Sequence, residues 1–144
     1  MAVGVGLWLP LMLDSLGFSL FSIDLLEGSI ALAVMLSGLG LRIWAAITLG
    51  KYYSTTLTIA EDHRVITAGP YSRIRHPGYL SEILMWSGFG VLSSNLVIAV
   101  LVPVIFVIVL LYRMSAEETM LVGELGDDYV RYQQRTRKLV PYVY

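Results

Sequence analysis

Residues 79–112 read YLSEILMWSGFGVLSSNLVIAVLVPVIFVIVLLY, which is two apolar stretches separated by one short polar tripeptide. The first stretch covers residues 79–92 and the second covers residues 96–112. The tripeptide at 93–95, Ser-Ser-Asn, leaves room only for a tight turn between them. The sequence therefore predicts a helical hairpin whose turn lies at a membrane surface.

Two further apolar stretches precede this hairpin. Residues 30–49 come close to the ~20 residues that a membrane-spanning helix needs. Residues 3–23 contain Asp14 and are interpreted as a retained first span, with a re-entrant or interfacial segment as the alternative. Together the four stretches predict about four transmembrane helices.

The composition favours lipid as the solvent for these stretches. Hydrophobic residues make up 56% of the 144 residues and charged residues 15%, whereas soluble domains carry roughly 25% charged residues. The mean hydropathy is +0.70. A soluble domain of this length has too small a core to bury so much apolar surface. We expect an all-α, polytopic membrane helical bundle that forms one domain over residues 1–144, with 1–26 holding the first span and 30–144 the core.

The basic residues indicate how the bundle is oriented. The net charge is only −1, but Lys and Arg cluster in residues 51–75 and 113–138. The positive-inside rule places both segments, and with them the C-terminus, on the cytoplasmic side. Arg42 lies within the second stretch and is interpreted as snorkelling to this interface, with a carboxylate partner inside the bundle as the alternative. The sequence contains no Cys, which excludes disulfides, thiolate metal sites and Cys nucleophiles.

Two spacing patterns predict contacts between helices. Small residues allow membrane helices to approach closely, and they occur at Ala33, Ser37, Gly40, Gly88 and Gly90. In the polar C-terminal segment, apolar and aromatic residues recur at helical spacing. This second pattern predicts a C-terminal amphipathic helix that lies on the membrane or folds back over the bundle, and it consists of Leu121, Leu125, Tyr129 and Tyr132.

Residues 69–79, GPYSRIRHPGY, hold the densest group of candidate functional side chains. The Gly-Pro pair predicts a turn, and Pro77 suits the first position of a helix. His76 would then sit at a helix N-terminus, where unpaired N–H groups can bind a carboxylate or a ribose oxygen. Tyr71 and Tyr79 offer aromatic faces on either side. The alternative interpretation is a basic and aromatic belt at the membrane interface.

Arg113, Glu117 and Glu118 follow the last apolar stretch. Arg113 and Glu117 are four residues apart and share one face of a continuing helix. An intrahelical ion pair is the simpler interpretation. Two adjacent carboxylates beside a bilayer, emerging on the same side as the His76 segment, instead favour a polar site.

Taken in order, these motifs resemble the isoprenylcysteine carboxyl methyltransferase family and its phospholipid-methylating relatives. The resemblance covers roughly residues 30–144. The matching elements, besides the hairpin, are His63 to Tyr71 (HRVITAGPY), Arg75 to Tyr79 (RHPGY), Arg113, Glu117-Glu118, Gly126 to Tyr129 (GDDY), Tyr132 and Pro141.

The resemblance implies a site for S-adenosyl-L-methionine. Arg113 and Glu117 are its expected catalytic residues, and Arg113 is expected to face the methyl acceptor. That acceptor is expected to be lipid-like or a small amphipathic molecule, carrying a carboxylate or an amine, and neither a metal nor a nucleic acid is expected. The implied cofactor contacts are His63, Arg64, Val65, Ile66, Tyr71, His76, Pro77, Gly78, Tyr79 and Glu117.

Two other functions remain compatible with the sequence. Membrane sterol and steroid reductases, which use NADPH, carry a similar Arg-His-x-x-Tyr element. The Glu117-Glu118 pair after the final helix favours the methyltransferase. The second alternative is a non-enzymatic membrane subunit whose polar segments dock a partner protein.

Overall fold

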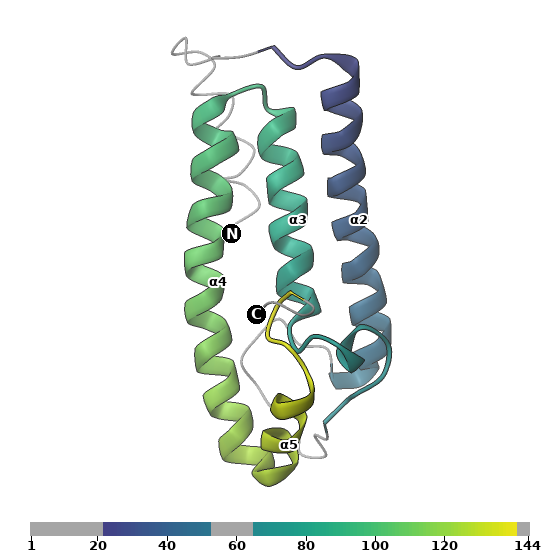
Figure 1. Cartoon of the computed structure of the whole chain (residues 1–144), viewed down its shortest axis with the longest axis vertical. Helices are drawn as coiled ribbons and strands as arrows, with labels where there is room; N and C mark the ends of the chain where they lie inside the picture. Colours follow the sequence, from purple (N-terminus) through teal and green to yellow (C-terminus); the bar gives the residue numbers. More distant parts are fainter. Residues whose placement is uncertain (1–21, 53–64, 141–144) are drawn as a thin grey trace.

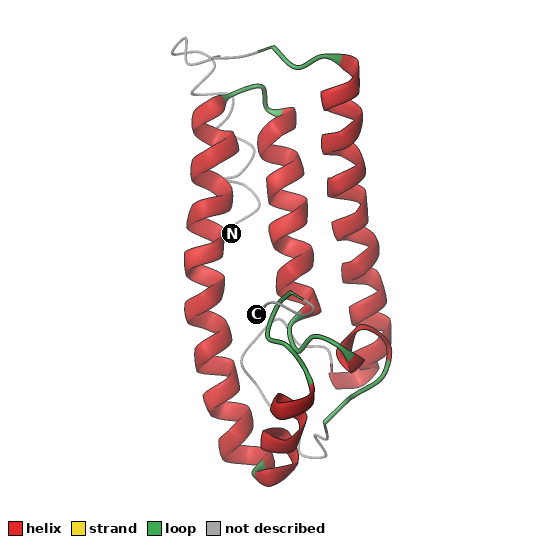
Figure 2. Cartoon of the chain, in the orientation of Figure 1, coloured by secondary structure: helices red, strands yellow, loops and turns green. Residues whose placement is uncertain are grey.

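The computed structural model describes residues 22–52 and 65–140. Within them every regular element is helical (Figure 2), which confirms the expected all-α fold. The predicted first span lies outside the described residues except for its last two positions. The elements are α2 (Leu25–Leu49), the short 3-10 helices η1 (Gly50–Tyr52) and η2 (Gly69–Ser72), α3 (Pro77–Leu92), α4 (Leu96–Leu125) and α5 (Asp127–Arg135).

The three long helices lie side by side, with α3 between α2 and α4 (Figure 1). The predicted hairpin joins α3 to α4. Asn95 caps α4, because its side-chain oxygen accepts hydrogen bonds from the backbone N–H groups of Val97 at 3.1 Å and Ile98 at 3.3 Å. Ser94 takes a positive φ of 53°, which completes the tight reversal of the chain.

Helix α2 begins at Leu25, before the predicted start at residue 30. Asp24 and Glu27 form a capping box, in which each side chain accepts a hydrogen bond from the other residue's backbone N–H. This reciprocal pairing satisfies two otherwise unpaired donors and extends the helix into its polar flank.

The helices touch through small residues, but not through those predicted on α2. A Cβ at Gly38 would lie 2.8 Å from the carbonyl oxygen of Ser81, so α2 and α3 are in backbone contact there. The face of α2 that contacts α3 carries Ala31, Gly38 and Ala45, all buried. The predicted face, Ala33, Ser37 and Gly40, is exposed.

Two of the described helices, α2 and α4, are long and apolar enough to cross a membrane. Large apolar side chains cover their outer surfaces, including Leu25, Ile47, Val104 and Ile108. Helix α3 has only 16 residues, or ~24 Å, which is less than the ~30 Å of a hydrocarbon core. Helix α4 has 30 residues, or ~45 Å, so it extends well beyond the start of α3.

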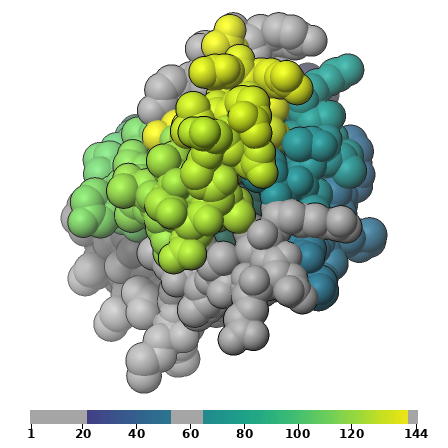
Figure 3. All heavy atoms as spheres, turned by 90° about the horizontal axis from the view of Figure 1, so that it is seen from below, coloured from purple at the N-terminus to yellow at the C-terminus, as the bar shows by residue number. Residues whose placement is uncertain are grey.

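The described parts of the polar segments lie at the end of the bundle where α3 begins (Figure 1). The predicted amphipathic helix folds back over the bundle here, but it is not continuous. Gly126, with φ 54°, ends α4, and α5 then starts in a new direction. Tyr129 and Tyr132 of α5 are buried, and α5 with the following segment lies over the middle of this end (Figure 3).

Arg42 does not simply snorkel to the interface, as the preferred interpretation had it. Its Nη1 atom lies 2.7 Å from Oε1 of Glu82, in a partly buried ion pair between α2 and α3. A charge within a membrane layer is costly, and a nearby carboxylate on the neighbouring helix lowers that cost. The structure therefore supports the alternative of a partner inside the bundle.

Candidate functional site

The segment before α3 folds as its turn signals predict. Gly69 adopts a positive φ of 54° and opens the 3-10 helix η2, which contains Pro70. His76 is the N-cap of α3, and Pro77 is its first residue, as predicted. The first hydrogen bond of the helix runs from the N–H of Leu80 to the carbonyl of His76 at 3.1 Å.

The C-terminal segment pairs with this polar segment in a short parallel arrangement. The N–H groups of Arg75 and His76 donate to the carbonyls of Arg137 and Lys138, at 2.8 Å and 3.1 Å. The N–H of Arg137 donates in turn to the carbonyl of Arg73 at 3.0 Å. These backbone hydrogen bonds fix two segments that are far apart in the sequence beside the first turn of α3.

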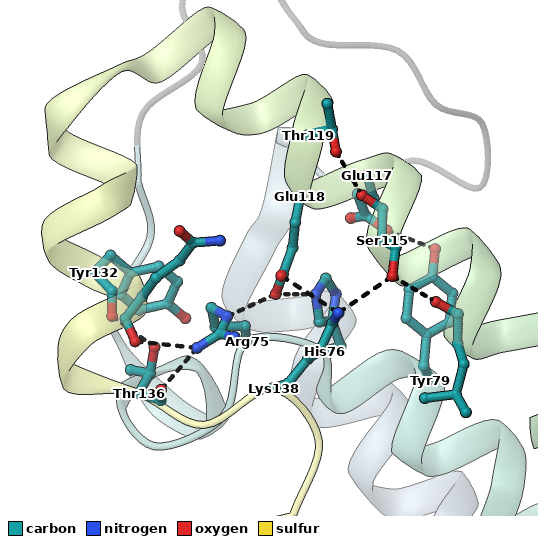
Figure 4. A network of polar contacts seen from close by, with 12 residues as sticks. Arg75, His76, Tyr79, Ser115, Glu117, Glu118, Thr119, Tyr132, Thr136 and Lys138 are labelled. Carbon is teal, nitrogen blue, oxygen red and sulfur yellow. Dashed lines mark hydrogen bonds and ion pairs between the residues drawn. The ribbon is translucent and has the colours of Figure 1, made fainter. Parts of the chain in front are cut away.

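Glu118 lies at the centre of the polar side chains (Figure 4). Its Oε1 atom accepts from Nε of Arg75 at 2.7 Å and lies 3.0 Å from Nε2 of His76. Its Oε2 atom lies 3.5 Å from Nζ of Lys138. The Glu118 side chain is 13% exposed, so one carboxylate, largely removed from water, joins α4, the start of α3 and the C-terminal segment.

Glu117, the neighbouring carboxylate, faces a different partner. The hydroxyl of Tyr79 donates a 2.6 Å hydrogen bond to its Oε2 atom. The guanidinium carbon of Arg113 lies 6.0 Å from the centre of the Tyr79 ring, within reach of a cation–π contact. Arg113 and Glu117 therefore both contact Tyr79, one at the ring face and the other at the hydroxyl.

Helix α5 is held to the site by side-chain hydrogen bonds to backbone carbonyls. The Tyr132 hydroxyl donates to the carbonyl of Tyr71 at 2.7 Å, and Nη1 of Arg75 donates to the carbonyl of Thr136 at 2.7 Å. Burial raises the pKa of the Tyr132 phenol above its ordinary value, and it does the same to the pKa of Tyr129. Both phenols therefore stay neutral at physiological pH, and the Tyr132 hydroxyl acts as a donor.

A pocket of about 420 Å³ lies against α5. Its wall combines the aromatic ring of Tyr132 with charged groups, and Arg131 is paired with Asp128 there. The lining residues are Val65, Thr67, Leu125, Asp128, Arg131, Tyr132 and Arg135.

The predicted contact residues fall into three groups. His76, Pro77, Gly78, Tyr79, Arg113 and Glu117 gather where α3 begins and α4 continues past it. Val65 lines the pocket beside α5, Ile66 is half-buried next to it in the chain, and Tyr71 is buried under Tyr132. His63 and Arg64 lie outside the described residues.

Sequence reasoning assigned no separate role to five residues that build the site, one of which is Glu118 at its centre. Arg75 and Lys138 bind Glu118, and Tyr132 and Thr136 hold α5 in place. Arg75 and Glu118 stand directly beside predicted residues, so the doubled Glu and the Arg-His pair were an available signal. No local pattern pointed to Lys138 or Thr136, because their contacts depend on how the chain folds back.

The first turn of α3 has room for a ligand. A Cβ at Gly78 would meet nothing within 4 Å. Helix geometry leaves the N–H groups of Gly78 and Tyr79 without an intrahelical acceptor. Within the described ranges, no group of three or more His, Cys, Asp or Glu side chains is placed to hold a metal. These N–H groups are suited to an anionic or hydroxyl oxygen, and the Glu117 carboxylate is suited to a positively charged group.

Comparisons of this chain with known proteins point to one family. The profile of the isoprenylcysteine carboxyl methyltransferase (ICMT) family matches residues 30–123. Protein-S-isoprenylcysteine O-methyltransferase B of Arabidopsis thaliana is 35% identical over 115 residues, which are 78% of this chain and 58% of that protein. The Schizosaccharomyces pombe protein-S-isoprenylcysteine O-methyltransferase is 28% identical over 115 residues, 78% of this chain and 49% of that protein.

A solved structure shares the fold. The eukaryotic intramembrane Ras methyltransferase ICMT superposes with a TM-score of 0.75 at 26% identity, over 81% of this chain and 42% of that one. The chain thus spans about half the length of the relatives it matches.

Proposed function

This chain belongs to the isoprenylcysteine carboxyl methyltransferase family, and we propose that it transfers a methyl group from S-adenosyl-L-methionine to a lipid-like acceptor at the cytoplasmic membrane face. The acceptor group is proposed to be a carboxylate, as in the isoprenylcysteine O-methyltransferases that it resembles. Family membership favours methyl transfer over the reductase and the non-enzymatic subunit that the sequence left open.

The observation that carries the proposal is the placement of Arg113 and Glu117 around Tyr79. Glu117 binds the Tyr79 hydroxyl, and the Arg113 guanidinium lies over the ring. The site thus offers a carboxylate and a guanidinium separated by one aromatic side chain. A cationic methyl donor and an anionic acceptor need such a pair of opposite charges, which lie close enough for the two molecules to meet but are separated from each other.

Some of the proposed cofactor contacts lie at the first turn of α3. The N–H groups of Gly78 and Tyr79 can bind an anionic or hydroxyl oxygen, and the open space at Gly78 admits a ligand against the backbone. Glu117 would face the positive part of the cofactor. The other proposed contacts are His63, Arg64, Val65, Ile66, Tyr71, His76 and Pro77.

When bound, S-adenosyl-L-methionine supplies an electrophilic methyl group on a sulfonium. A carboxylate acceptor is already ionised at neutral pH, so the chain needs no general base. Arg113 would bind both oxygens of that carboxylate through its planar fork. The roles of the remaining residues would be to position the reactants and exclude water.

The depth of the site suits an acceptor that arrives from the lipid. The start of α3 lies ~24 Å from the hairpin, so Tyr79 falls inside or at the edge of a hydrocarbon layer of ~30 Å. The basic segments next to the site, residues 51–75 and 113–138, favour the cytoplasmic side. A water-soluble cofactor would enter from that side, and an amphipathic acceptor would enter between helices.

The test uses purified protein with methyl-labelled S-adenosyl-L-methionine and two acceptors, a prenylated cysteine with a free carboxylate and a total membrane lipid extract. We expect a labelled product whose label is released as methanol by mild base, since a methyl ester is base-labile. A label that is stable to base would indicate that the acceptor group is an amine and not a carboxylate. Binding of NADPH without binding of S-adenosyl-L-methionine would overturn the proposal.

A further inference from the structure

The contacts of Glu118 constrain the side chain of His76. Glu118 accepts from Arg75 at 2.7 Å through the same oxygen that lies 3.0 Å from Nε2 of His76. The His76 ring is buried, with its side chain 3% exposed. Its backbone is also held, because its N–H donates to Lys138 and its carbonyl accepts from Leu80. The ring therefore has little freedom to turn away from Glu118.

The carboxylate decides which ring nitrogen of His76 carries a proton. A carboxylate paired with a guanidinium offers only acceptor oxygens, so Nε2 must be the donor in the 3.0 Å contact. Arg75 and Lys138 already place two positive charges around this one negative charge. In a neutral imidazole whose Nε2 carries the proton, Nδ1 keeps its lone pair.

We propose that Glu118 is a positioning residue that fixes His76 as the Nε2–H tautomer, so that Nδ1 is presented as a hydrogen-bond acceptor to an ammonium or hydroxyl group of the cofactor. This inference rests on the proposed function, in which His76 is a cofactor contact. His76 caps α3 next to the open space at Gly78, so a fixed ring there selects a donor group and rejects an acceptor group. Glu117 has the separate task of facing the cofactor directly.

Nitrogen-15 NMR of histidine-labelled protein in detergent tests the tautomer without any ligand. The chain has two His, and a His63→Gln variant assigns the signals of His76. In the wild type we expect a pyrrole-like Nε2 and a pyridine-like Nδ1. In Glu118→Gln, whose amide can both donate and accept, we expect a mixture of tautomers. Its affinity for S-adenosyl-L-methionine should fall roughly tenfold, by analogy with a metal-binding His that loses the hydrogen-bond partner of its other ring nitrogen.

The control is Glu124→Gln, which removes an exposed carboxylate from the same helix and should change neither the tautomer nor the affinity. A wild-type His76 protonated on Nδ1, with or without a proton on Nε2, overturns the inference, even if the Glu118 variant does not fold. An unchanged tautomer in Glu118→Gln, or a changed tautomer with unchanged affinity, also overturns it. A wild type that binds no S-adenosyl-L-methionine contradicts the proposed function instead, while the ligand-free spectra still decide whether Glu118 sets the His76 ring.

Discussion

Gly88 of α3 packs directly against the backbone of Ala31 in α2. A Cβ at position 88 would lie 2.5 Å from the carbonyl oxygen of Ala31 and 2.9 Å from the backbone nitrogen of Met35. Both neighbours are backbone atoms, which cannot move aside without shifting a helix. The contact holds the hairpin end of α3 close to α2.

Gly88→Ala is therefore expected to destabilise the protein by about 1–3 kcal/mol, the usual cost of overpacking. The measurement is the midpoint of thermal unfolding in detergent. Gly40→Ala is the matched control, because nothing lies within 4 Å of its Cβ position. Gly40→Ala should raise the midpoint slightly, since Ala stabilises a helix interior relative to Gly. Equal effects of the two substitutions would contradict the packing of α2 on α3.

The same region shows why the contact face of α2 could not be predicted. Helix α2 is apolar on nearly all sides, so the hydrophobic pattern does not distinguish a face toward protein from a face toward lipid. Small residues occur on both faces, and only the packed helices show that Ala31 and Gly38 make the contact while Gly40 does not. The hairpin turn and the start of α3 at Pro77 were predictable, because capping and proline geometry are local.

The functional site likewise has residues that could be identified from the sequence and residues whose position depends on the fold. The motif residues His76, Tyr79 and Glu117 could be identified from the sequence and do come close together. The central position of Glu118 could not, because it depends on the C-terminal segment folding back to bring Lys138 beside α4.

Tyr79→Phe tests the hydrogen bond between Tyr79 and Glu117. The substitution keeps the ring and removes only the hydroxyl that donates at 2.6 Å. A hydrogen bond to a charged group contributes about 1.5–3 kcal/mol, so affinity for S-adenosyl-L-methionine should fall roughly tenfold or more if Glu117 contacts the cofactor. Calorimetric titration measures this affinity. Tyr112→Phe, at an 82% exposed tyrosine of α4, should leave the affinity unchanged.

A double-mutant cycle tests the ion pair between Arg42 and Glu82. Because both side chains are about one-third exposed, we expect a coupling energy of only ~0.5–1 kcal/mol. Arg42→Gln and Glu82→Gln should each lower the thermal midpoint, and the double variant should lose less than their sum. Additive losses would mean that the two charges act independently.

Single cysteines in this Cys-free chain test the proposed sidedness. Ser72 and Gln134 are exposed at the site end, and Leu96 is exposed at the hairpin end. In sealed vesicles of known orientation, an impermeant thiol reagent should label Ser72→Cys and Gln134→Cys from the cytoplasmic side only, and Leu96→Cys from the opposite side only. Leu96 is preferred to Asn95, which is buried and caps α4. Labelling of all three variants from one side would contradict a spanning hairpin.

Separate substitutions of Arg113 and Glu117 decide whether the site is divided between acceptor and cofactor. Glu117→Gln should chiefly weaken cofactor binding, because it removes the charge that faces the cofactor. Arg113→Ala should leave cofactor affinity largely intact and abolish methyl transfer. Arg113→Lys should not restore full activity, because an ammonium cannot reproduce the two-pronged contact of a guanidinium with a carboxylate.

Cofactor affinity is measured by titration and methyl transfer with labelled donor, both in the same detergent. The variants compared are those whose thermal midpoints match that of the wild type. If Arg113 and Glu117 serve only to hold Tyr79 and α4 together, both substitutions should reduce affinity and transfer in parallel and modestly. The divided site requires the two measurements to separate. Loss of transfer at unchanged affinity in Arg113→Ala, together with lost affinity in Glu117→Gln, is the pattern that a purely structural role cannot produce.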